Sequence, residues 1–216
     1  MLLNTNHAQN VVIETSGLPW VESPASGVWR RMLERSGGED ARATSIVRYD
    51  PGAGFPEHAH PGGEEILVLA GTFEDEHGAY PTGTYIRNPA GFRHQPCCPQ
   101  GCTIFVKVRH FNPEDTGRVV VDTRTSPWQP GLVPGLEVAP LSDFRGEHTA
   151  LVRWAPGTVF RPHRHWGGEE ILVLEGVFSD EHGDYPAGTW LRSAHLSLHH
   201  PFSKPGCTIF VKVGHL

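Results

Sequence analysis

The sequence predicts an all-β protein made of two tandem jelly-roll β-barrels, and three observations support this prediction. First, residues 46–110 align with residues 151–215 without a gap, and about 37 of the 65 aligned pairs are identical. Second, Gly (25) and Pro (19) are frequent in a chain of 216 residues. Third, short runs of β-branched and aromatic residues lie between clusters of Gly and Pro, as is typical of small barrels and sandwiches.

The repeat predicts two homologous domains and their boundaries. Upstream of the gapless region, VVIETSGLPW (11–20) corresponds to VVVDTRTSPW (119–128). We therefore expect domains at 11–110 and 119–216, with a tail at 1–10. The segment FNPEDTGR (111–118) is polar, contains Pro and Gly, and is expected to be the linker.

Within the first repeat, four runs have the composition of β-strands. They are Ser45–Tyr49, Glu65–Leu69, Thr84–Arg87 and Thr103–Val108. The segment Trp29–Arg35 is the one place where a helical turn is expected. Because the two repeats align without a gap, we expect strands at the corresponding positions of the second repeat.

Composition argues against several classes of partner. The formal net charge is −6 and the pI is about 6.1, so we expect no nucleic acid and no anionic membrane surface as partner. No apolar run approaches the roughly 20 residues that span a bilayer. The start MLLNTNHAQN lacks the features of a secretion signal, so a cytoplasmic location is expected. The four cysteines do not form a disulfide framework at this length and are expected to be reduced.

The histidines predict a metal site in each repeat. His58, His60 and Glu64 share one parity, so on strands they face the same side, and His94 follows on another strand. A pair of histidines at a strand edge is usually an ordinary polar feature, but here the whole pattern occurs twice in register. Three imidazoles and one carboxylate suit zinc or iron, with manganese or nickel as alternatives, and leave coordination positions open. The expected ligands, one ion per domain, are His58, His60, Glu64, His94, His163, His165, Glu169 and His199.

At these residues the sequence resembles the cupin superfamily. Gly52-x5-His58-x-His60-x3-Glu64-x6-Gly71 is similar to the first cupin motif, and Gly83-x5-Pro89-x-Gly91-x2-His94 to the second. The phrases EEILVLAG, DEHGAYPTGTYIRNP and GCTIFVKV resemble more narrowly the ChrR-type cupins. That resemblance implies either a regulatory protein related to the ChrR anti-sigma factor or a small metal-dependent dioxygenase.

Two departures from the family pattern matter. The resemblance to ChrR implies an N-terminal zinc-binding helical domain, yet residues 1–45 contain one histidine and no cysteine. In the second repeat NPAGFRH becomes SAHLSLH, so the turn before His199 is expected to be rebuilt. His195 and His200 beside that ligand are expected to be exposed.

Other polar residues have structural interpretations. Glu65 and Glu170 have the opposite parity to the ligand carboxylates and should face away from the metal. Salt bridges are expected from Arg48, Arg87 and Lys107 and their counterparts Arg153, Arg192 and Lys212, with a substrate-carboxylate clamp as the alternative. The DEHG segments (75–78 and 180–183) are interpreted as solvated turns.

The cysteines leave a redox alternative open. Cys97 and Cys98 lie close to His94, where vicinal thiols could register oxidants. The second repeat lacks them, so metal binding cannot require them. Cys102 and Cys207 precede apolar strands and are expected to be buried small side chains.

Two classes of function stay open at this level. The first is a ChrR-like, metal-binding regulatory module that lacks the sigma-binding domain and acts through a protein partner. The second is a metal-dependent dioxygenase that acts on a small dicarbonyl or a hydroxylated aromatic ketone, whose pocket would be the interior of the barrel. In either case a small-molecule ligand is expected in the barrel, and the fused pair is expected to be a pseudo-twofold monomer or a homodimer.

Overall fold

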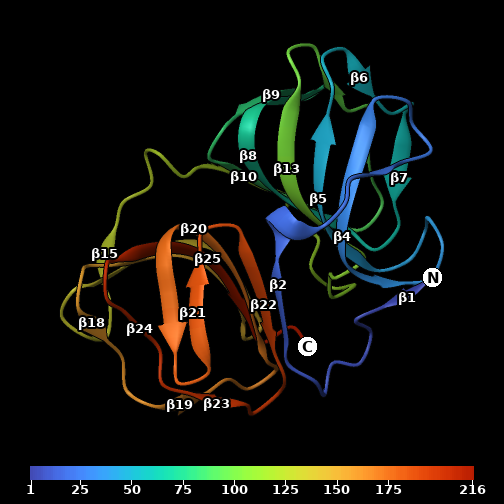
Figure 1. Ribbon diagram of the computed structural model, residues 1–216. Coiled ribbons are helices and arrows are strands. Elements are labelled where there is room, and N and C mark those ends of the chain that lie inside the picture. Colours follow the sequence, from blue (N-terminus) through green and yellow to red (C-terminus); the bar gives the residue numbers. More distant parts are fainter. The chain divides into compact units, whose positions relative to one another are not determined.

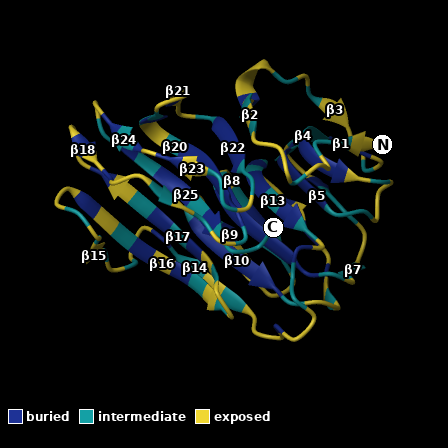
Figure 2. Ribbon diagram, turned by 90° about the horizontal axis from the view of Figure 1, so that it is seen from below, coloured by how far each residue is buried: buried dark blue, intermediate teal, exposed yellow.

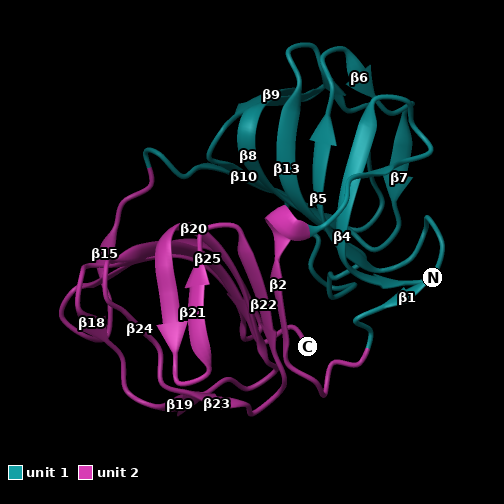
Figure 3. Ribbon diagram, in the orientation of Figure 1, with its two compact units in different colours: residues 1–5, 18–125 teal, residues 6–17, 126–216 magenta.

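The computed structural model describes residues 1–216, and β-strands make up nearly all of its regular structure (Figure 1). The one helical element is the short 3-10 turn η1 (Thr15–Gly17). No helix has the length and apolar character needed to cross a membrane. The chain divides into two compact units, residues 1–5 with 18–125 and residues 6–17 with 126–216 (Figure 3).

The strands of unit 1 come almost entirely from the first repeat. They are β1 (Leu2–Leu3), β3 (Val21–Glu22), β4 (Val28–Ser36), β5 (Ala43–Tyr49), β6 (Ala53–Gly54), β7 (His58–His60), β8 (Glu64–Asp75), β9 (Gly78–Pro81), β10 (Thr84–Asn88), β11 (Phe92–His94), β12 (Cys97–Cys98), β13 (Cys102–Val108) and β14 (Val119–Asp122).

The strands of unit 2 follow the same plan. They are β2 (Val11–Glu14), β15 (Gln129–Pro130), β16 (Leu136–Phe144), β17 (Glu147–Trp154), β18 (Thr158–Val159), β19 (His163–Arg164), β20 (Glu169–Asp180), β21 (Gly183–Pro186), β22 (Thr189–Ser193), β23 (Leu198–His199), β24 (Phe202–Ser203) and β25 (Cys207–Val213).

Each unit is a jelly-roll barrel of antiparallel strands. The main sheet of unit 1 has the order β1-β4-β5-β13-β8-β10-β14, and that of unit 2 has the order β15-β16-β17-β25-β20-β22-β2. The long strands β8 and β20 pair with β13 and β25 through one register shift each, beside Thr103 in unit 1 and Val173 in unit 2. A register shift of this kind bends a strand, so one continuous strand serves both faces of the barrel. The strands predicted from sequence within the first repeat all lie inside observed strands.

The core of each barrel lies between the sheets. In unit 1 it includes Val47, Ile66, Val68, Phe73 and Ile104, each at most 6% exposed. Successive residues on β8 point to opposite faces, so one face of the strand fills the core and the other is also covered. Figure 2 shows the result as buried central strands and exposed connecting loops.

The first strand of each repeat belongs to the unit formed by the other repeat. β14 pairs with β10, with Val121 opposite Tyr85, and so extends the sheet of unit 1. β2 pairs with β22, with Ile13 opposite Trp190, and so extends the sheet of unit 2. The boundaries of the compact units therefore differ from those of the sequence repeats by one strand in each direction.

The predicted helical turn at Trp29–Arg35 is wrong. These residues lie within strand β4, which pairs with β5 from Val28 opposite Tyr49 to Arg35 opposite Ala43. The segment has few β-branched residues, so its composition resembles that of a helix. Cross-strand pairing and burial outweigh this weak local preference.

The prediction of four reduced cysteines is also wrong. Cys98 and Cys102 form a disulfide with a Cα–Cα separation of 6.0 Å, while Cys97 and Cys207 are free. The turn between β12 and β13 brings the two paired residues together. In unit 2, Ser203 takes the position of Cys98, so Cys207 keeps its thiol, and burial raises its pKa to about 11.

Candidate metal centres

The side chains of the unit 1 centre come from three strands, β7, β8 and β11. β7 and β11 pair so that His58 lies opposite His94, and His60 lies two residues along β7 on the same side. Glu64 opens β8 after a tight turn in which Gly63 has φ 72°. A Cβ on Gly63 would lie 2.5 Å from the ring of Phe111, so this turn requires glycine.

The ligating atoms of unit 1 converge on one point. Potential ligand atoms of His58, His60 and His94 all lie within 4.8 Å of one another. The Nε2 atoms of His60 and His94 are 3.0 Å apart. The Glu64 carboxylate places Oε1 at 3.5 Å from His60 Nε2 and Oε2 at 3.5 Å from His94 Nε2.

Hydrogen bonds at the other ring nitrogens orient two of these imidazoles. His58 Nδ1 donates to the carbonyl of Pro56 at 2.9 Å, and His94 Nδ1 donates to Asp75 Oδ2 at 3.3 Å. A proton fixed on Nδ1 leaves a lone pair on Nε2, which faces the centre. This is the usual arrangement of a metal-ligating histidine.

Unit 2 repeats the arrangement with small differences. His163, His165 and His199 form the second group, with Nε2–Nε2 distances of 3.3 Å from His199 to each of the other two. Glu169 Oε1 lies 3.2 Å from His165 Nε2, and its Oε2 lies 3.6 Å from His199 Nε2. The outer contact from His199 Nδ1 to Asp180 is longer, at 4.0 Å.

The two centres differ in their proton affinities. Burial lowers the pKa of His60, whereas the pKa of His94 is raised because Asp75 and Glu64 outweigh the opposing effect of burial. In unit 2 burial lowers the pKa of His165 to about 3 and that of His199 to about 4. Burial also raises the pKa of Glu169 to about 8. Both centres thus favour neutral imidazoles at His60 and His165.

The donor set fits a divalent metal ion. Neutral imidazoles that face one another with lone pairs are held together most readily by a cation between them. Glu169 Oε2 is buried and has no hydrogen-bond partner, which a cation at this point would supply. Three nitrogens and one oxygen suit zinc, iron, manganese or nickel. The structure therefore contains two histidine groups that can hold a metal ion, and the two carboxylates are placed to complete them.

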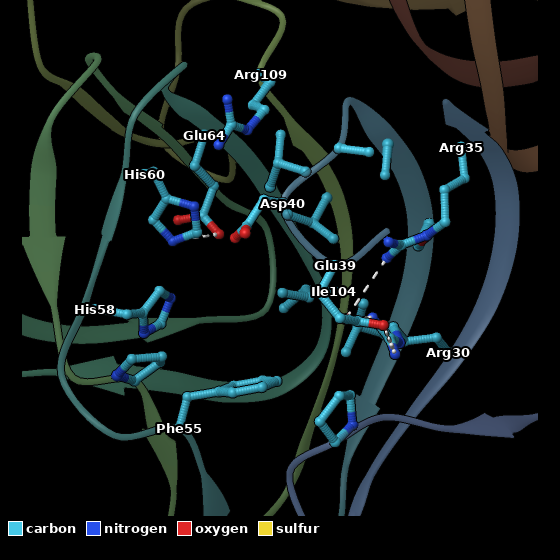
Figure 4. Close-up of a pocket in the computed structure, with 18 of the residues that line it drawn as sticks. Arg30, Arg35, Glu39, Asp40, Phe55, His58, His60, Glu64, Ile104 and Arg109 are labelled. Atoms are coloured by element: carbon cyan, nitrogen blue, oxygen red, sulfur yellow. Dashed lines mark hydrogen bonds and ion pairs between the residues drawn. The ribbon is translucent and has the colours of Figure 1, made fainter. Parts of the chain in front are cut away.

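The two centres open into different cavities. The cavity of unit 1 has a volume of about 370 Å³ and is lined by both apolar and charged side chains (Figure 4). The cavity of unit 2 is about 170 Å³, and beyond its histidines and Glu169 it is lined by apolar residues such as Trp154, Phe160 and Val211. Unit 1 therefore has more room for a polar ligand at its centre.

The structure brings together all of the residues expected from sequence as ligands, four in each unit. It also shows an outer partner of a ligand, Asp75, that the sequence interpretation missed. Asp75 begins the DEHG segment, which was expected to be a solvated turn, but its side chain is 1% exposed and contacts His94. Glu76 and His77 are exposed, so within this segment the interpretation is wrong for Asp75. In unit 2 it is wrong for Asp180, whose side chain is 8% exposed and lies 4.0 Å from His199 Nδ1. The occurrence of DEHG in both repeats was the available signal.

We expect Asp75→Asn to weaken metal binding in unit 1 by about 10- to 100-fold, as the loss of an outer carboxylate partner generally does. The amide would no longer hold the Nδ1 proton of His94 with a charged acceptor. Asp180→Asn in unit 2 is the matched variant, and its effect should be smaller because its contact with His199 is longer. Competition with a chromogenic chelator measures both affinities. Equal effects in the two units would contradict this ranking.

The turn before the last ligand is preserved in unit 2 and not rebuilt, contrary to the sequence expectation. Leu196 occupies the position of Gly91, and its amide donates to His165 at 3.0 Å as that of Gly91 donates to His60 at 2.8 Å. The φ of Leu196 is 62° and that of Gly91 is 84°. A leucine in this left-handed conformation is strained, because its Cβ crowds the backbone. His195 and His200 are exposed, as expected.

We expect Leu196→Gly to stabilise unit 2 by about 1 kcal/mol, because glycine adopts this conformation without strain. The reverse change, Gly91→Leu, should destabilise unit 1 by about 1–2 kcal/mol. A Cβ at Gly91 meets nothing within 4 Å, so backbone conformation alone sets this cost. Urea unfolding of both variants provides the measurement, and a stabilising Gly91→Leu would refute the argument.

The remaining polar candidates have structural roles. Glu65 and Glu170 are buried on the face away from the metal centres, where they accept hydrogen bonds from Tyr85 and from Trp190. Arg87 pairs with Asp115.

The other expected salt-bridge residues divide between buried and exposed positions. Lys107 is buried and donates to Thr44 at 3.1 Å. Arg48 and Arg153 make surface ion pairs, with Asp50 at 3.6 Å and with Glu137 at 3.3 Å. None of these is a side chain of the unit 1 cavity.

Two jelly-roll barrels in one chain, each with a histidine group that can hold a metal ion, define a duplicated cupin. No curated protein sequence matches the chain. The chain belongs to the ChrR Cupin-like domain family, whose sequence pattern it matches twice, at residues 8–112 and 116–216.

Solved structures share the two-barrel fold. A candidate dioxygenase from Nostoc punctiforme is 15% identical with a TM-score of 0.78, covering 95% of this chain and 82% of that protein. The formate complex of Lactobacillus farciminis oxalate decarboxylase is 13% identical with a TM-score of 0.68, covering 96% and 87%. The Escherichia coli pirin YhhW with nickel(II) is 14% identical with a TM-score of 0.68, covering 95% and 98%. At these identities the likeness shows the fold alone.

Proposed function

We propose that the chain is a metal-dependent enzyme whose unit 1 centre acts on a small oxygen-rich compound, with a dicarbonyl or hydroxylated ketone and dioxygen as reactants. The observation that carries this proposal is the cavity of about 370 Å³ that opens directly on the histidines of unit 1. A metal ion with a purely structural role needs no such space beside it. A closed four-ligand site would serve that role better.

The side chains of unit 1 suit such a reaction. His58, His60, Glu64 and His94 would hold the ion, which when bound supplies Lewis acidity and, if it is iron, redox chemistry toward dioxygen. Phe55 and other apolar side chains line the cavity and limit the access of water. The Glu64 carboxylate lies within 3.5 Å of two imidazoles and borders the cavity, where it can hold a proton of the bound compound.

The test is oxygen uptake by iron-loaded protein with a panel of small 1,2- and 1,3-dicarbonyls and hydroxyketones. We expect uptake that depends on one substrate class, that is lost in His60→Ala, and that persists in His165→Ala. The likeness in fold to a candidate dioxygenase supports this choice of assay. Absence of uptake across the panel, from protein that retains its iron, would overturn the proposal.

A second function is favoured by the family match. Both repeats match the ChrR Cupin-like domain, which supports a regulatory module in which the metal, here zinc, fixes the site and a protein partner reads the bound state. This function predicts that even iron-loaded protein consumes no oxygen and that a partner binds with different affinity when a small ligand is present. Substrate-dependent oxygen uptake would count against it.

A further inference from the structure

Three arginines line the cavity that contains the histidines of unit 1, namely Arg109 and a pair on one strand, Arg30 and Arg35. Arg30 and Arg35 both lie on β4, and both line the cavity that also contains His58 and His60. In the view of Figure 4 the two guanidinium groups lie on the right and the two imidazoles on the left, with Ile104 between them. The guanidinium groups and the imidazoles therefore border one cavity.

The two guanidinium groups are more deeply buried than their acidic partner. The side chains of Arg30 and Arg35 are 14% and 7% exposed, while that of Glu39 is 58% exposed. Glu39 contacts Arg30 with both oxygens, at 2.7 and 3.2 Å, but lies 4.0 Å from Arg35. The Nε atoms of both arginines are buried without a hydrogen-bond partner. An exposed carboxylate offsets little of the cost of burying two cations.

Glu39 lies on the loop between β4 and β5, which contains two glycines. The β4–β5 connection includes Gly37 and Gly38, and Arg35 donates to the carbonyl of Gly38. Glycines at these positions permit several backbone conformations. A carboxylate thus already contacts this arginine pair in the free protein, and it is carried by a loop whose glycines permit other backbone conformations.

Unit 2 has no equivalent of this arginine pair. In unit 1 Arg30 lies opposite Val47 and Arg35 opposite Ala43. At the corresponding registers of unit 2, Val138 lies opposite Val152 and Asp143 opposite His148. The smaller unit 2 cavity accordingly contains no arginine. An oxyanion site is therefore a property of unit 1 and not of the shared fold.

We propose that Arg30 and Arg35 form a carboxylate-binding subsite, so that the ligand of unit 1 is a small carboxylic acid with a second oxygen donor, such as a 2-oxo or 2-hydroxy acid. The second donor would face the metal centre, and in this respect the inference rests on the proposed function. Paired guanidinium groups recognise a planar carboxylate through charge-assisted hydrogen bonds. Glu39 competes for the same groups in the free protein.

The test compares two probes of nearly the same shape, pyruvate and butane-2,3-dione, which differ in one carboxylate. Calorimetric titration of the zinc-loaded protein should show a preference for pyruvate of about 10-fold or more, with one site per chain. Arg30→Met and Arg35→Met should each abolish most of this preference while leaving binding of the dione unchanged. Arg48→Met, a partly exposed arginine outside the cavity, is the matched control and should keep the preference.

Glu39→Gln should change pyruvate binding in the opposite direction. Loss of the competing charge should strengthen it by about 3- to 10-fold, with the dione unaffected. Because the Glu39 side chain is exposed, we expect this variant to fold normally. The test therefore remains decisive even if an arginine variant fails to fold. Pyruvate binding is thus expected to weaken in the two arginine variants and to strengthen in the Glu39 variant.

Two results would overturn the subsite. One is a wild-type protein that holds its metal and binds both probes equally. The other is a preference that survives the arginine substitutions. If the wild-type protein holds no metal, the proposed enzyme function fails, and the same titrations on metal-free protein decide the subsite by whether pyruvate is still preferred.

Discussion

Replacing His60 with alanine is expected to reduce the metal content of the protein from two equivalents to one, and His165→Ala should do the same through the other unit. Each substitution removes a nitrogen that lies within about 3 Å of a second imidazole nitrogen at its centre. The loss of affinity should exceed the roughly 10- to 100-fold that accompanies changes to outer partners. Metal analysis by mass spectrometry on protein purified without added metal measures the stoichiometry.

The control for this experiment is His200→Ala. His200 is exposed and directly follows the expected ligand His199, so its loss should leave two equivalents in place. The double variant His60→Ala with His165→Ala should bind none. Full metal content in that double variant, or no metal in the folded wild-type protein, would contradict the assignment of the centres.

Replacing Glu170 with alanine is expected to destabilise unit 2 by about 3–5 kcal/mol, as breaking a buried charged network does. Glu170 is 3% exposed and accepts hydrogen bonds from Trp190 Nε1 at 2.7 Å and His215 Nε2 at 3.0 Å. Its cross-strand neighbours are the buried cations Arg192 and Lys212. The alanine variant would leave buried polar groups without the carboxylate that they face.

Urea unfolding monitored by tryptophan fluorescence measures this loss, since Trp190 is itself a partner of Glu170. Glu175→Ala is the matched control on the same strand. Glu175 is exposed, so its substitution should change stability by no more than about 0.5 kcal/mol. If Glu170→Ala lowers the free energy of unfolding no more than Glu175→Ala does, the buried network contributes nothing to stability.

Much of the fold could be predicted because the repeat made each signal visible twice. Glycine and proline clusters mark the turns, and runs such as Thr103–Val108 and their copies have the composition of strands. Strand β4 could not be predicted in this way, because its pairing with β5 is a tertiary effect with no local signature. The pairing of β2 and β14 with the sheets of the opposite repeats likewise depends on which sheet edge is free. No local sequence pattern indicates which edge that is.

The convergence of the expected ligands could be predicted for a similar reason. The spacing of His58, His60 and Glu64 obeys strand parity, and the three side chains meet as parity requires. Asp75 was missed because its role requires the distance to His94, which is 19 positions away in sequence and on another strand. Arg30 and Arg35 were missed because only the cavity shows which residues share it with the histidines.

The strand exchange has a consequence for proteolysis. A single cut within residues 111–118 would separate the two repeats in sequence, yet each fragment would retain a strand that belongs to the sheet of the other fragment's barrel. The nicked protein should therefore stay together as a complex of two fragments, in the manner of fragment complementation. By the same reasoning, an unfused single copy would complete its barrel only by donating its first strand to a second molecule and accepting one in return.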